Sequence, residues 1–117
     1  MKSCEILVVN RLDRDLTALT ETFTRLGYPV ADDGDIVVVD ARESSASEWA
    51  AIEGDLLAGR HRPTVVISDD HDPQVVSMAQ RLGPSVVFTN GGSEIGYAVA
   101  VKLCALLLDE QAAGVAA

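Results

Sequence analysis

Two kinds of hydrophobic pattern alternate along the chain. Short continuous runs of β-branched and aliphatic residues predict strands that are buried on both faces, because such strands lack polar alternation. Segments whose apolar residues recur every three or four positions predict helices with one buried face. The predicted strands are 5–9, 35–40, 64–68 and 85–89, and the predicted helices are 13–26, 45–58, 72–82 and 93–109.

Local signals mark the helix boundaries. Asp13 fits the start of the first helix, and Gly27 fits its end. Ser45 and Glu48 predict a capping box, in which each side chain accepts a hydrogen bond from the other residue's backbone N–H. Asp72, followed by a proline, predicts the start of the third helix.

Alternating strands and helices predict an α/β fold, a doubly wound, flavodoxin-like parallel sheet of four main strands with helices on both faces. The segment between Gly27 and Gly34 is too short for a crossover helix. Residues 28–31 are therefore either a loop or short edge strand, or one arm of a hairpin with 35–40. A right-handed unit would carry 35–40 away from 64–68 unless the first helix changed face or the connection were unusual, so the strand order stays open.

The composition limits the function. The 117 residues fit one domain over residues 1–110, followed by a flexible tail or linker start at 111–117. The net charge of −9 disfavours direct contact with nucleic acid or with an anionic membrane. No apolar run of about 20 residues and no secretory signal is visible, so we expect a cytoplasmic protein. Cys4 and Cys104 are expected to be buried thiols.

In parallel sheets of this kind, functional groups gather where the strands end. Four aspartates fall near these ends and are candidate ligands for a divalent cation, unless they form an ordinary solvated loop: Asp13, Asp40, Asp69 and Asp70.

The chain resembles the receiver domains of response regulators over nearly its whole length. Ile6–Asp13 is similar to the first strand and loop of that family, and the strand 35–40 ends in Asp40 at the phosphoacceptor position. Ser68 stands at the serine/threonine switch position of the family. Asn90 stands where receivers carry a lysine, and Val87 where they carry an aromatic residue.

The departures from the receiver pattern predict that phosphoryl chemistry is lost. Receivers hold Mg²⁺ with an acid pair, but this sequence has Asn10 and Arg11 there. Asn90 lacks the positive charge that stabilises the transferred phosphoryl group. We therefore expect no enzyme activity, no catalytic residue and no cofactor. Arg11 either forms a salt bridge with Asp40 or points into solvent. The second helix of the receiver fold is expected to be missing or reduced.

The last predicted helix carries two nearly opposite apolar stripes. One consists of Ile95, Val99, Leu103 and Leu106, and the other of Tyr97, Val101, Cys104 and Leu108. A surface helix needs only one such stripe, so the other needs a partner or deeper burial in this domain. We assign the interface to the second stripe: Tyr97, Val101, Cys104 and Leu108. The expected partner is a second copy, another protein or an output domain after residue 117.

The sequence thus predicts a phosphorylation-independent, receiver-like module of bacterial signalling or transcription control, acting through protein contacts. Two alternatives remain. One is a phosphoacceptor with altered chemistry at Asp40. The other is a small-molecule sensor, in which Gly91-Gly92-Ser93 leads into a helix N-terminus that suits an anion.

Overall fold

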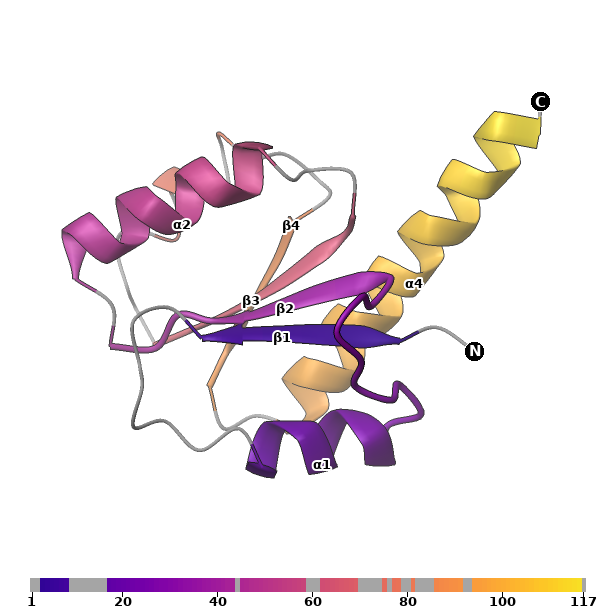
Figure 1. Ribbon diagram of the computed structural model, residues 1–117, viewed down its shortest axis with the longest axis horizontal. Helices are drawn as coiled ribbons and strands as arrows, with labels where there is room; N and C mark the ends of the chain where they lie inside the picture. The colour runs from indigo at the N-terminus through magenta and orange to yellow at the C-terminus, as the bar shows by residue number, and fades with distance from the viewer. Residues whose placement is uncertain are drawn as a thin grey trace.

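In the computed structural model, the described residues form the following elements in chain order (Figure 1): β1 (Cys4–Val8), α1 (Thr17–Arg25), β2 (Ile36–Asp40), α2 (Ala46–Ala58), β3 (Thr64–Ser68), β4 (Val86–Asn90) and α4 (Glu94–Ala116). The structure describes residues 3–8, 17–43, 45–58, 62–69, 86–91 and 94–116, together with positions 75, 77, 78 and 81. The predicted α/β fold is confirmed, and the strands lie within one residue of their predicted bounds.

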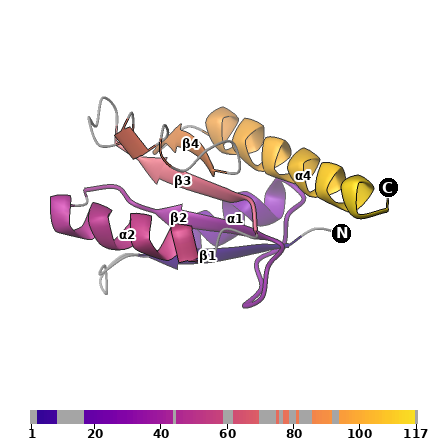
Figure 2. The ribbon, with the colours of Figure 1, turned by 90° about the horizontal axis from the view of Figure 1, so that it is seen from above.

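All strand pairs are parallel, in the order β1-β2-β3-β4. The β-branched runs form β2 and β3, whose residues are buried throughout because both strands lie inside the sheet and helices cover both faces. β4 lies at one edge of the sheet, and four of its five residues are half-buried. Figure 2 shows α2 and α4 on opposite sides of this sheet.

Each face of the sheet has its own core. On one face, α1 and α4 pack together over the strands, and the rings of Phe23 and Tyr97 stack with their centroids 5.7 Å apart. On the other face, Trp49 and Ile52 of α2 and the helical residue Met78 cover the sheet. Both faces of the sheet can hold a core, because alternate strand residues supply an apolar surface on each side.

The connection from α1 to β2 settles the open question of residues 28–31. Val30 forms an isolated parallel bridge with Cys4 at the outer edge of β1. Cys4 N–H donates to the Pro29 carbonyl at 2.9 Å, and Ala31 N–H donates to the Cys4 carbonyl at 2.8 Å. The segment is therefore a short edge strand, and the hairpin interpretation is wrong. Counting this edge piece, the order corresponds to the 2-1-3-4-5 arrangement of flavodoxin-like sheets.

This edge piece also explains the strand order. After α1, the chain pairs briefly with the outer side of β1. It then crosses the start of β1 and enters β2, which lies between β1 and β3. Gly34 makes the crossing possible, because a Cβ there would overlap the backbone of Cys4 and Glu5. α1 keeps its face, and Asp40 nevertheless lies beside the strand that ends in Ser68. No helix lies between α1 and β2, as the sequence predicts.

The helix ends follow local chemistry. Gly27, at φ +97°, ends α1, and Tyr28 N–H donates to the Phe23 carbonyl at 2.9 Å in a Schellman motif. The capping box is confirmed, because Ser45 N–H donates to Glu48 Oε1 at 2.8 Å and Glu48 N–H to Ser45 Oγ at 3.3 Å.

Three predicted boundaries differ or remain outside the described residues. α4 continues to Ala116, so the tail expected from residue 111 is helical; alanine favours the helix, and a single glycine does not end it. The predicted starts of the first and third helices, Asp13 and Asp72, lie outside the described residues. Among the described helices, none combines the length and the apolar character needed to cross a membrane.

Candidate functional site

Three predicted site residues meet where neighbouring strands end. Asp40 closes β2, Ser68 closes β3 opposite Asn90 of β4, and the strands are adjacent. Asp40 is 1% exposed and Ser68 is 2% exposed, whereas Asn90 is exposed. The parallel register places the three residues at the carboxyl edge of the sheet, where functional groups gather in such folds. Asn10 and Arg11 lie outside the described residues, so the predicted pair between Arg11 and Asp40 stays a prediction.

Arg42 forms a two-pronged ion pair with Asp40. Its Nε donates to Oδ1 at 2.9 Å, and its Nη2 donates to Oδ2 at 2.8 Å. The backbone N–H of Arg42 also donates to Oδ1, at 3.2 Å. The Asp40 side chain is fully buried, whereas the Arg42 side chain is 28% exposed. Arg42 therefore lies between the carboxylate and solvent. Such fork-like pairing engages both oxygens of the carboxylate.

The turn after β2 holds Arg42 in this position. Ala41 N–H donates to the Ile67 carbonyl at 2.8 Å, which continues the pairing with β3 one residue beyond Asp40. Glu43 then adopts a left-handed conformation, with φ +61°, and its N–H donates to Asp69 Oδ2 at 2.6 Å. The left-handed conformation costs a non-glycine residue about 1 kcal/mol of stability. The charge-assisted hydrogen bond that the Asp69 carboxylate accepts offsets this cost.

Gly91 provides the space that the Arg42 side chain occupies. A Cβ at this position would overlap Cδ of Arg42. Gly91 is fixed against β3 by its N–H, which donates to the Ser68 carbonyl at 2.9 Å. The ion pair therefore depends on residues from the ends of β2, β3 and β4. A buried charge is costly without a partner, so the structure is stabilised when the three strand ends are placed to let Arg42 reach Asp40.

Arg42 stays protonated beside Asp40. Hydrogen bonding to Asp40 raises the pKa of Arg42 above its ordinary value, with burial acting in the opposite direction and the nearby negative charge adding to the rise. Arg42 is therefore a permanent cation beside Asp40, the residue at the position expected for a phosphoacceptor.

The predicted acidic cation site does not assemble among the described residues. Asp40 binds Arg42, and Asp69 binds the backbone of Glu43, so these two carboxylates have other roles. The described residues contain no group of three or more side chains suited to a metal ion. Asp13 and Asp70 lie outside the described residues.

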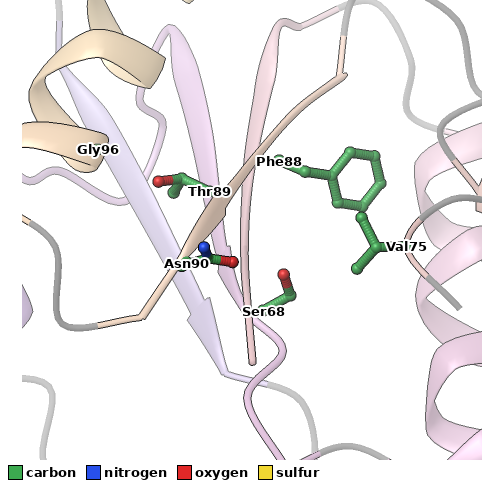
Figure 3. A pocket seen from close by; sticks show the side chains of 6 residues that line it. All are labelled: Ser68, Val75, Phe88, Thr89, Asn90 and Gly96. Atoms are coloured by element: carbon green, nitrogen blue, oxygen red, sulfur yellow. The ribbon is translucent and has the colours of Figure 1, made fainter. Parts of the chain in front are cut away.

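A cavity of about 370 Å³ opens beside this site at the end of β4. Six residues line it: Ser68, Val75, Phe88, Thr89, Asn90 and Gly96. Figure 3 shows the Phe88 ring directed toward Val75 and the Ser68 hydroxyl facing the open space. No described residue forms a hydrogen bond with that hydroxyl, although the residue is almost fully buried. The cavity can therefore take an apolar group together with a hydrogen-bonding one.

The predicted interface on α4 needs correction. Tyr97, Val101 and Cys104 are buried in the core, and Leu108 packs partly against it. The other stripe faces outward, with exposures of 80% for Ile95, 55% for Val99, 45% for Leu103 and 50% for Leu106. Both stripes fit the helical period, and only the docking of α4 on the sheet decides which one is buried.

Two residues of the site escaped the sequence reasoning. Arg42 follows Asp40 by two positions, and Gly91 directly follows the last strand. The signals were an arginine two residues after an acid at one strand end and a glycine at another. Neither becomes informative until the sheet order places β2 and β4 on either side of β3.

Comparisons with known proteins support the fold. No family model matches the sequence, and no curated protein is significantly similar to it. The structure is similar to the crystal structure of a protein from Burkholderia pseudomallei that is provisionally named pilus assembly-related. The TM-score is 0.68 at 18% sequence identity, over 90% of each chain. At this identity, the similarity shows a shared fold alone.

Proposed function

We propose that this chain is a receiver-like regulatory module that acts by binding other proteins and does not transfer phosphate. Its apolar surface carries the interaction function. The four large hydrophobic side chains that are exposed in the described part of the chain all lie on one stripe of α4: Ile95, Val99, Leu103 and Leu106. Contiguous exposed apolar residues usually mark a protein interface.

The ion pair at the strand ends supports the absence of phosphoryl transfer. Phosphorylation of an aspartate needs a free carboxylate oxygen as nucleophile and a metal ion held by oxygen ligands. In this protein both Asp40 oxygens accept hydrogen bonds from Arg42, and the carboxylate is fully buried. The cation that pairs with Asp40 is thus a side chain of this protein rather than a bound metal ion.

The proposal extends to the cellular setting. The flavodoxin-like sheet and the acceptor-like position of Asp40 support a role in bacterial signalling or transcription control. Cys4 and Cys104 are free and buried, which supports a reducing compartment such as the cytoplasm.

Photo-crosslinking tests the interaction function. A benzoylphenylalanine replaces Val99 on the exposed stripe, and the matched control carries it at Ala51, an exposed position of α2. Irradiation of expressing cells is expected to give one dominant adduct from position 99 and none from position 51. The adduct mass distinguishes a second copy from another protein. Equal labelling from both positions, or none from position 99, would contradict the proposal.

Phosphate independence has its own test. The protein is incubated with acetyl phosphate and Mg²⁺, and its intact mass is measured together with that of Asp40→Asn. The expected mass is unchanged for both proteins. A phosphoryl adduct that forms on the wild type and disappears in Asp40→Asn would show that the carboxylate still accepts phosphate.

A further inference from the structure

The outer edge of β4 is open to pairing. β4 pairs with β3 on one side, and no described strand lies on the other. Gly91 N–H donates to the Ser68 carbonyl. Because backbone groups alternate along a strand, the N–H and C=O of Phe88 and Asn90 point away from β3. No described residue forms a hydrogen bond with these outward groups. An open edge of this kind is a template for another strand.

Two hollows flank this edge, one mainly on the α2 face of the sheet and extending to Gly96 of α4, and one on the α4 face. The cavity of about 370 Å³ includes Phe88, which packs with the α2 face. A second cavity of about 280 Å³ lies on the α4 face and is lined by Val87, Leu103, Leu106, Leu107 and Glu110. Figure 3 shows the side chains of Phe88 and Thr89 pointing in different directions from β4. Successive side chains of an added strand would also alternate between these faces, and so would enter the two hollows in turn.

The charges indicate what kind of strand fits. The five residues of β4 carry no charge, and Glu110 is the one charged residue among those that line the leucine-rich cavity. A second copy would add another net charge of −9 and another Glu110 to the contact. High net charge of one sign opposes self-association, whereas a basic segment is attracted to this surface.

We propose that β4 binds an extended, basic segment of a partner protein as an additional strand. An apolar side chain of the segment enters the cavity formed by Val87, Leu103 and Leu106, and a lysine or arginine two positions away, on the same face, pairs with Glu110. The next side chain, on the opposite face, enters the cavity beside Ser68. This inference rests on the proposed interaction function, and it names the partner chemistry and the binding mode.

A synthetic peptide tests the binding mode. The probe is the fluorescent peptide RTVRLTVR. In an extended chain its valines and leucine lie on one side and its threonines on the other, and its three arginines supply the positive charge. Its binding to the intact chain is followed by fluorescence anisotropy. One control peptide carries N-methyl groups on its four central residues, which removes the strand-pairing donors and keeps the side chains. A second control replaces each arginine with glutamate. Both controls are expected to bind at least about tenfold more weakly, a difference of about 1.4 kcal/mol.

Two variants at one exposed position test the strand edge. Asn90→Pro removes an outward N–H, and proline is tolerated on edge strands where the N–H faces solvent. Asn90→Ala removes the side chain and keeps that N–H. We expect Asn90→Pro to weaken peptide binding roughly tenfold relative to Asn90→Ala. Unchanged melting temperatures of the variants show that the fold is retained.

Several results would overturn this proposal. They are the absence of binding by the basic peptide, equal binding by the N-methylated peptide, and equal affinities of the two Asn90 variants. Light scattering adds a further test: a wild-type dimer that becomes monomeric in Asn90→Pro would show that a second copy occupies the edge. Persistent crosslinking from position 99 in any of these cases would leave the interaction function intact while refuting strand addition.

Discussion

Replacing Arg42 with alanine tests whether the ion pair with Asp40 holds the strand ends together. The substitution leaves a carboxylate with 0% side-chain exposure that has lost two of its hydrogen bonds. Removing one partner of a buried ion pair typically costs roughly 3–5 kcal/mol. The cost is lower here, because the Arg42 side chain is 28% exposed and the backbone N–H still donates to Oδ1. We expect a loss of about 2–3 kcal/mol in the free energy of unfolding.

The measurement is urea denaturation followed by the fluorescence of Trp49, the single tryptophan, which is buried on α2. A loss of this size corresponds to a decrease of roughly 10 °C in melting temperature for a domain of this length. Arg25→Ala is the matched control, because the pair of Arg25 with Glu94 has side-chain exposures of 60% and 54%. Exposed pairs contribute about 0–1 kcal/mol, so the control is expected to unfold nearly as the wild type does.

A double variant separates loss of the pair from loss of packing. Asp40→Asn in the Arg42→Ala background replaces the buried charge with a neutral amide, which needs no cation. The double variant is therefore expected to regain more than about 1 kcal/mol relative to Arg42→Ala. The reasoning is refuted if Arg42→Ala costs no more than Arg25→Ala, or if removing the charge of Asp40 restores no stability.

Four further predictions concern close contacts and buried thiols. Gly91→Ala places a methyl group where the Arg42 side chain lies, so we expect a loss of about 1–2 kcal/mol that largely disappears in the Arg42→Ala background; urea denaturation of both backgrounds measures this coupling. Gly34→Ala meets backbone rather than a flexible side chain, so we expect a loss above about 2 kcal/mol, and a melting temperature equal to that of the wild type would disprove the tight crossing. Burial raises the pKa of the Cys4 and Cys104 thiols to about 12, so iodoacetamide at pH 8 is expected to label them only after unfolding. The stability that these protonated thiols contribute is fully present below pH 9. It decreases between pH 9 and about 12, because the thiols ionise at lower pH in the unfolded chain than in the folded one. Chemical denaturation across this range checks the sign.

The strands and the two interior faces were accessible from the sequence because their signals are local. Runs such as 36–39 and 64–67 have one stable environment, a strand covered on both faces. The capping box at Ser45 and the glycine at the end of α1 depend on hydrogen bonds within a few residues. These features need no knowledge of what lies across the sheet, so pattern and propensity were sufficient to predict them.

The candidate site was only partly accessible for the opposite reason. The sequence identified Asp40, Ser68 and Asn90 as strand ends, because parallel strands end on one edge. It did not identify Arg42 as the partner of Asp40. That pairing depends on a turn fixed by Asp69 and on the space left by Gly91, which come from two other strand ends.

By itself, the sequence determined the fold class, the strands and the presence of two apolar stripes on the last helix. Only the tertiary structure decided the strand order, because a bridge at Val30 and a backbone contact at Gly34 route the chain under β1. The structure also decided which stripe of α4 is exposed. Helical periodicity defines both stripes equally well, and the free energy of burial selects one of them only when the sheet provides a surface to pack against.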